Sequence, residues 1–158
     1  MLFRSVIAAA VLPIVAGCHL IAEHASDPLC PPLRAFVSSV DPHVTREFVF
    51  YTSWGSGFKG DDVASISKKQ CVHANYPPAK AVCESLMNTG AVEFSGNNAK
   101  RAVSCLSKGT RFAPHMSLEQ GSFSFSYGTD NRGALITVSF AEDEPLGAMA
   151  LRVTADGY

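Results

Sequence analysis

The residues from 122 to 140, SFSFSYGTDNRGALITVSF, alternate apolar and polar side chains on both sides of a short turn. On an extended chain the apolar members point to one side, namely Phe123, Phe125, Tyr127, Ala134, Ile136, Val138 and Phe140. Residues 129–133 carry the Asp, Asn and Gly typical of a turn. The pattern predicts two antiparallel strands in a hairpin, and therefore a sheet with one covered face and one solvated face.

The rest of the chain supplies further strands and a layer to cover that sheet. Residues 47–54, EFVFYTSW, favour a strand because they are rich in aromatic and β-branched side chains, and Met149, Leu151 and Val153 indicate a final strand. Residues 77–90 predict an amphipathic helix with the apolar stripe Ala79, Val82, Cys83 and Leu86. A second helix is expected from Asn97 or Asn98 as its cap to Gly109, with the stripe Ala99, Ala102, Val103 and Leu106. We also expect a short helix over residues 61–71 and a short strand over residues 91–94.

These elements predict an α+β fold. The expected architecture is a two-layer sandwich, in which an antiparallel sheet of four or five strands carries two main helices on one face. Residues 30–158 are long enough to form this as one domain.

The N-terminus has the layout of a secretory signal peptide over residues 1–17. One positive charge at Arg4 is followed by an apolar run of about 12 residues, well short of the ~20 that cross a bilayer as a helix. The run ends in Val15-Ala16-Gly17-Cys18, which resembles the lipobox of bacterial lipoproteins. The resemblance implies that Cys18 is lipidated and becomes the new N-terminus. His19 in place of Asp implies delivery to the outer membrane, facing the periplasm, with residues 18–29 as a tether.

The other four cysteines are Cys30, Cys71, Cys83 and Cys105, an even set in a chain expected to be exported. Exported thiols are oxidised, so we expect two disulfides. Four cysteines allow three pairings, and the spacing alone does not choose among them. We favour Cys30 with Cys71 and Cys83 with Cys105, because the latter two lie in the two helices expected to share one side of the sheet.

No residue pattern indicates a catalytic, cofactor or metal site. Gly55, Gly57 and Gly60 match a dinucleotide-binding pattern, but that pattern requires a parallel βαβ unit and the chain indicates antiparallel strands. The Cys71-Val72-His73 triplet lacks the paired spacing typical of structural zinc. The formal net charge of −1 argues against nucleic acid as a partner.

Function is therefore expected on loops. Two glycine-bearing connections follow strands, residues 54–60 and residues 129–133, and loops on a rigid sheet commonly carry recognition. The candidate partner-binding residues are Trp54, Phe58, Lys59, Asp130, Asn131 and Arg132. The favoured interpretation is a lipid-anchored protein-binding module of the envelope, such as an inhibitor or immunity protein. The alternatives are a small peptidoglycan-directed enzyme and a structural envelope component.

Overall fold

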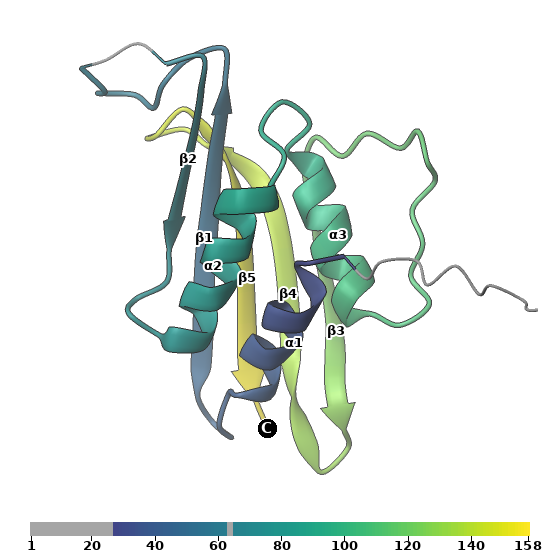
Figure 1. Ribbon diagram of the computed structural model, residues 1–158. Coiled ribbons are helices and arrows are strands. Elements are labelled where there is room, and N and C mark those ends of the chain that lie inside the picture. Colours follow the sequence, from purple (N-terminus) through teal and green to yellow (C-terminus); the bar gives the residue numbers. More distant parts are fainter. Residues whose placement is uncertain (1–26, 63–64) are drawn as a thin grey trace, which may run out of the picture.

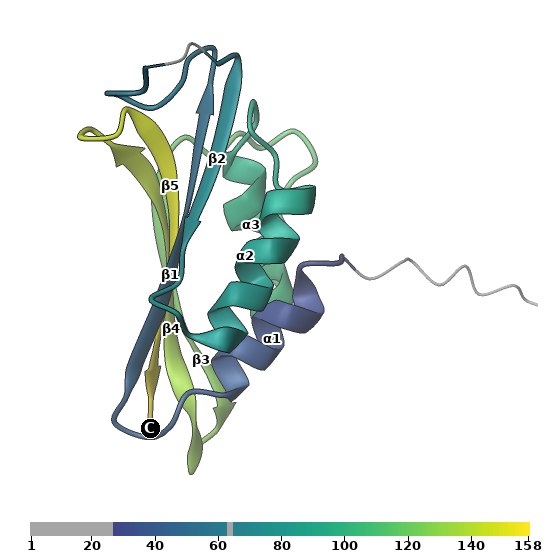
Figure 2. The ribbon, with the colours of Figure 1, turned by 60° about the vertical axis from the view of Figure 1, so that its left-hand side comes forward.

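The computed structural model describes residues 27–62 and 65–158. Five strands form one sheet in the order β2-β1-β5-β4-β3, and every neighbouring pair is antiparallel. The strands are β1 (Thr45–Trp54), β2 (Ser67–Val72), β3 (Gly121–Thr129), β4 (Arg132–Asp143) and β5 (Ala148–Gly157). The helices α1 (Cys30–Ser38), α2 (Pro77–Thr89) and α3 (Gly96–Leu106) all cover the same face of the sheet (Figures 1 and 2). The predicted α+β sandwich is confirmed.

The core lies between the sheet and the helices, where the apolar side chains of the alternating strands pack against the apolar stripes of the helices. Ile136, Val138 and Phe140 of β4 are at most 2% exposed, and Phe36 of α1 packs edge-to-face on Phe48 of β1 with ring centroids 5.4 Å apart. The predicted hairpin, the first and last strands and both amphipathic helices are present. The opposite face of the sheet carries the small hydroxyl side chains of β3, which are exposed as the alternation predicts.

Three elements differ from the sequence predictions. Helix α1 was missed, although its buried residues Cys30, Leu33, Phe36 and Val37 follow a helical stripe behind two prolines at the first positions. Residues 67–72 form the edge strand β2 and not a helix, because pairing with β1 outweighs local propensity. Residues 91–94 form a bend and turn between α2 and α3, because the Asn98 side chain, and not a neighbouring strand, pairs with both backbone groups of Ala91.

The two predicted disulfides are present, but the favoured pairing was wrong. Cys30 is bonded to Cys105, and Cys71 is bonded to Cys83. The prediction assumed that two helices alone cover the sheet. Helix α1 instead packs against both α2 and α3 and lies between them (Figure 1), which separates Cys83 from Cys105. The first disulfide joins the start of α1 to the end of α3, and the second ties the edge strand β2 to α2.

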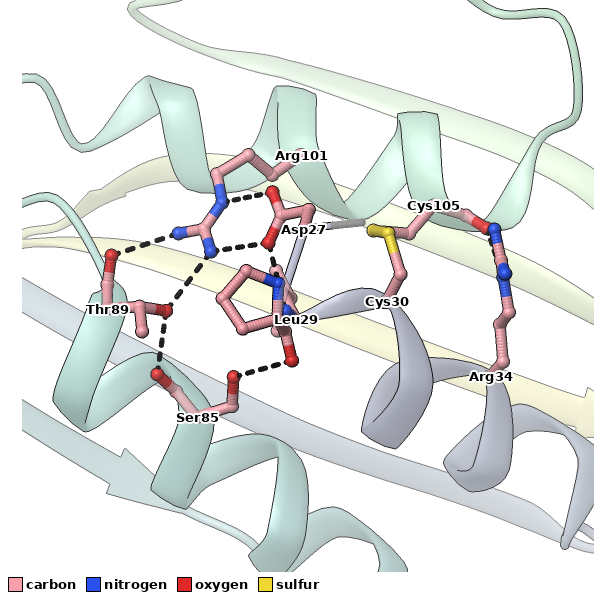
Figure 3. The surroundings of a disulfide bond; sticks show 9 residues. Asp27, Leu29, Cys30, Arg34, Ser85, Thr89, Arg101 and Cys105 are labelled. Carbon is pink, nitrogen blue, oxygen red and sulfur yellow. Dashed lines mark hydrogen bonds and ion pairs between the residues drawn. A yellow bond between two sulfur atoms is a disulfide. The ribbon is translucent and has the colours of Figure 1, made fainter. Parts of the chain in front are cut away.

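The folded domain begins before Cys30. Leu29, which the sequence assigned to the tether, is 1% exposed and belongs to the core. Asp27 accepts two hydrogen bonds from the Arg101 guanidinium, at 2.6 and 2.7 Å, and one from the backbone N–H of Leu29 (Figure 3). The Arg101 side chain therefore lowers the pKa of the Asp27 carboxyl below its usual 3.8, although partial burial opposes the shift. This ion pair and the neighbouring Cys30–Cys105 disulfide fix the point where the chain joins the helix layer.

Candidate binding surface

The two predicted recognition loops lie at opposite ends of the sheet. β1 and β4 run in the same direction, because each pairs antiparallel with β5. The end of β1 at Trp54 is therefore at one end, and the β3–β4 turn at Asp130 and Asn131 is at the other (Figure 1). The two loops do not form a single surface.

The β3–β4 turn offers little structure for recognition. Asp130, Asn131 and Arg132 are all exposed. Arg132 lies 3.7 Å from Asp41, but both side chains are more than half exposed, and such surface ion pairs contribute little. The turn lines none of the grooves described below.

The β1–β2 connection is held against the domain. Phe58 is 6% exposed, and its ring is covered by Lys68, whose ammonium lies 4.8 Å from the ring centroid, so little of the side chain is open to a partner. Asp61 pairs with Lys68 and accepts the Phe58 N–H, and these contacts lower the pKa of the Asp61 carboxyl. Lys59 is also engaged, since its Nζ donates to the Glu144 carbonyl at 2.6 Å.

Trp54 is the last residue of β1, at the start of this connection. It is 55% exposed, whereas an aromatic residue at a strand end is more often part of the core. It lines a small groove of about 210 Å³ with Val92 and Glu93 of the α2–α3 connection. The sequence indicated Trp54 as a candidate but not Val92 or Glu93.

A larger groove of about 480 Å³ continues from the first. The two grooves share Glu93, Ser95 and Met149. The walls of the larger groove come from residues 93–97 and from residues 114–119 of the α3–β3 connection, and its floor is formed by Phe140 and Met149. Phe94 and Met116 at its edge are 68% and 42% exposed. We call the set Trp54, Val92, Glu93, Phe94 and Met116 the loop rim.

Buried contacts fix the two walls of the larger groove. Asn98 is 1% exposed, and its side-chain amide accepts the N–H of Ala91 at 2.9 Å and donates to the Ala91 carbonyl at 2.7 Å. The prediction that Asn97 or Asn98 caps α3 is therefore wrong: the N-cap position is Ser95, and the Asn98 side chain holds the preceding connection. Gly96 lies so close to Leu118 that a Cβ would be 2.0 Å from the Leu118 carbonyl oxygen. The absence of a side chain at Gly96 lets the two walls meet.

Acidic side chains surround the apolar residues of the loop rim. Glu93, Glu119 and Glu142 line the two grooves. Among the described residues that line them, Lys100 is the one Lys or Arg, and its Nζ donates to the Met116 carbonyl at 2.6 Å. The surface is therefore suited to an apolar group flanked by positive charge.

The Cys71-Val72-His73 triplet and the glycines at positions 55, 57 and 60 do not take the geometry of a structural metal site or of a dinucleotide-binding site. Within residues 27–62 and 65–158, no three His, Cys, Asp or Glu side chains gather closely enough to hold a metal ion. Cys71 is bonded to Cys83 and so is lost as a metal ligand. The glycines at positions 55, 57 and 60 connect antiparallel strands, which lack the parallel βαβ unit that dinucleotide binding requires.

Comparison with known proteins gives no indication of function, so the function has to be inferred from the geometry of the surface. No protein-family model, curated protein or solved structure matches this chain. Among the helices in the described ranges, none has both the length and the apolar content to span a bilayer. The predicted signal peptide and the lipidation site Cys18 lie outside the described residues.

Proposed function

We propose that this chain is a lipid-anchored protein of the bacterial envelope that binds another protein through its loop rim. The observation that carries the binding role is the gathering of Trp54, Phe94 and Met116, all at least 42% exposed, around two connected grooves. Exposed apolar groups clustered on one surface are typical of interaction sites. Large aromatic side chains are also those that most often dominate binding energy.

The scaffold supports this role because it fixes the loops before a partner arrives. Asn98 and Gly96 hold the two walls, and disulfides join α1 to α3 and β2 to α2. A preformed surface loses less conformational entropy on binding than a flexible one. The acidic groove lining favours a partner that inserts an apolar side chain flanked by Lys or Arg. A basic target protein would offer such a group to an inhibitor or immunity protein.

The anchoring part of the proposal rests on residues 15–18 and on the disulfides, which are expected for an exported chain. The described chain begins at the outer side of the helix layer, whereas the end of β1 and the α2–α3 connection, which carry Trp54 and residues 92–94, lie at one end of the sheet (Figures 1 and 2). Anchoring the chain upstream of Asp27 therefore leaves the loop rim accessible.

Site-specific photo-crosslinking in cells tests the binding role. A photoreactive amino acid replaces Phe94 or Met116 in the full chain, and Leu135 serves as the control because it is 44% exposed on the opposite end and face. We expect Phe94 and Met116 to label the same protein and Leu135 not to label it. Glu93→Lys should weaken the adduct at Met116. Equal labelling at all three positions would place the contact elsewhere, and adducts with glycan strands alone would favour the peptidoglycan-directed alternative.

The anchoring role is tested separately. Cys18→Ser should release the protein from membranes or leave it unprocessed, and the intact mass of the wild type extracted from membranes should include the lipid. A mature wild-type protein that starts at another residue and is released without detergent would contradict the lipidation.

A further inference from the structure

The sheet has two edges, and they differ in how they are protected. β2 is a six-residue strand with Lys68 and Lys69, and Lys69 Nζ donates to the Met87 carbonyl of α2. The Cys71–Cys83 disulfide adds a covalent link between this edge and the helix layer. Short strands and lysines are two of the ways in which natural proteins prevent an edge from pairing with another chain.

The other edge, β3, has none of these features. Its nine residues, GSFSFSYGT, include no charged residue and no proline. Along this strand the backbone groups on the side away from β4 meet no other strand of the described chain, since β3 is the last strand in the sheet order. A long, uncharged edge strand is a template for a further strand.

The side chains of β3 show that its helix-side face is incompletely covered. Phe123, Phe125 and Tyr127 are half-buried, in contrast with the fully buried Ile136 and Val138 of the adjacent strand. Helix α3 packs against β4, and Phe112 of the α3–β3 connection contacts Phe123 edge-to-face at 5.8 Å. A neighbouring strand with apolar side chains on the same face would complete the burial of these rings.

We propose that β3 pairs antiparallel with β3 of a second copy of this chain, so that the two sheets of five strands become one. A two-fold axis at Phe125 aligns all nine residues of each strand. In this register Phe123 faces Tyr127 of the second copy, and Ser124 faces Ser126. Side chains alternate with a period of two, so this pairing places every aromatic ring on the helix side and every serine on the other.

A second copy fits this edge for two reasons. The strand is self-complementary, because its neutral, alternating pattern reads the same way in both directions and meets no like charge. The second reason is the position of Asp27. It is the first described residue, and 26 residues of the chain precede it. The helices cover one face of the sheet (Figure 2), so a two-fold axis normal to the sheet keeps both helix layers, and with them both Asp27 residues, on the same side.

Sedimentation velocity of the full chain in a density-matched detergent tests the proposal. We expect the wild type to sediment with the mass of two chains. The double variant Ser124→Lys, Ser126→Lys places like charges directly opposite each other across the proposed axis, which is unfavourable in antiparallel pairs, and should weaken the dimer roughly 10-fold or more. The matched control Leu135→Lys, Ala141→Lys adds the same charge to the same face one strand inward and should remain dimeric.

A charge-swap experiment separates loss of pairing from loss of folding. The Lys double variant is co-expressed with Ser124→Glu, Ser126→Glu under a different affinity tag. The two should co-purify through opposite charges, although each alone should dimerise more weakly than the wild type. A monomeric wild type, a dimer that survives the Lys substitutions, or failure of the two charged variants to associate would overturn the proposal. Association of β3 with a different envelope protein in place of a second copy would also overturn it.

Discussion

Removal of each disulfide in turn tests both the pairing and the scaffold. The Cys30–Cys105 bond spans 75 residues of sequence and the Cys71–Cys83 bond spans 12. In the chain-entropy model these loops correspond to a stabilisation of about 4.5 and about 3 kcal/mol, because the longer loop removes more freedom from the unfolded chain. Cys30→Ala, Cys105→Ala should therefore reduce the free energy of unfolding by about 1.5 kcal/mol more than Cys71→Ala, Cys83→Ala.

The assay is urea unfolding followed by circular dichroism, in a Cys18→Ser background so that Cys18 adds no thiol. Thiol titration of the denatured variants checks the pairing directly. With the pairing observed here, Cys30→Ala, Cys105→Ala leaves no free thiol, since Cys71 and Cys83 remain bonded to each other. The alternative pairing of Cys30 with Cys71 leaves two. Two free thiols, or a larger loss of stability from the shorter loop, would refute the reasoning.

Four substitutions probe individual contacts by the same unfolding assay. Phe58→Ala should lower the free energy of unfolding by about 3 kcal/mol because Phe58 is buried, while Trp54→Ala should change it by less than about 1 kcal/mol and weaken only partner binding. Asp27→Asn should cost about 1 kcal/mol at neutral pH; because the pKa of Asp27 is lowered, this difference should shrink as the pH falls below 3.8. Asn98→Ala should cost about 2 kcal/mol and reduce crosslinking at Phe94, because both backbone groups of Ala91 lose their partner. Equal stability of the Phe58 and Trp54 variants, a pH-independent effect at Asp27, or an unchanged adduct in the Asn98 variant would contradict the corresponding contact.

The parts of the fold that the sequence predicted are those in which local pattern and tertiary packing agree. Residues 122–140 alternate strictly and residues 77–89 keep one apolar stripe, so both could form only one element with a single buried face. Residues 61–71 predict a helix from Asp61 at the start and Val63 and Ile66 behind it, whereas the β2 residues, SKKQCV, have no apolar alternation that would indicate a strand. The strand form of β2 depends on β1 and on the bond to Cys83, which are distant in sequence. Missing α1 then led to the wrong disulfide pairing, since α1 is the helix that separates α2 from α3.

The candidate site was less predictable for a related reason. Trp54 and Phe58 have the same aromatic character in the sequence, but Trp54 is 55% exposed whereas Phe58 is covered by Lys68. Phe94 and Met116 were not identified, because residues 91–94 resemble a short strand and Met116 lies in a connection without periodicity. The buried contacts of Asn98 and Gly96 that bring them together join residues across two connections. A polar Asn at an interior helical position was the one sequence signal that could have indicated them.

The proposed dimer and the proposed anchor constrain each other. Pairing through β3 keeps the helix layers of both copies on one side, so two lipidated cysteines could insert into the same membrane. The hydroxyl-rich faces of both sheets would then point away from that membrane. The axis at Phe125 reverses the strand direction of the second copy, which places its loop rim at the opposite end. A partner with two binding sites would therefore have to span the joined sheet, while a partner with one would bind each rim independently. Two binding events of equal affinity per dimer are the expected outcome for a monovalent partner, since the rims share no residues.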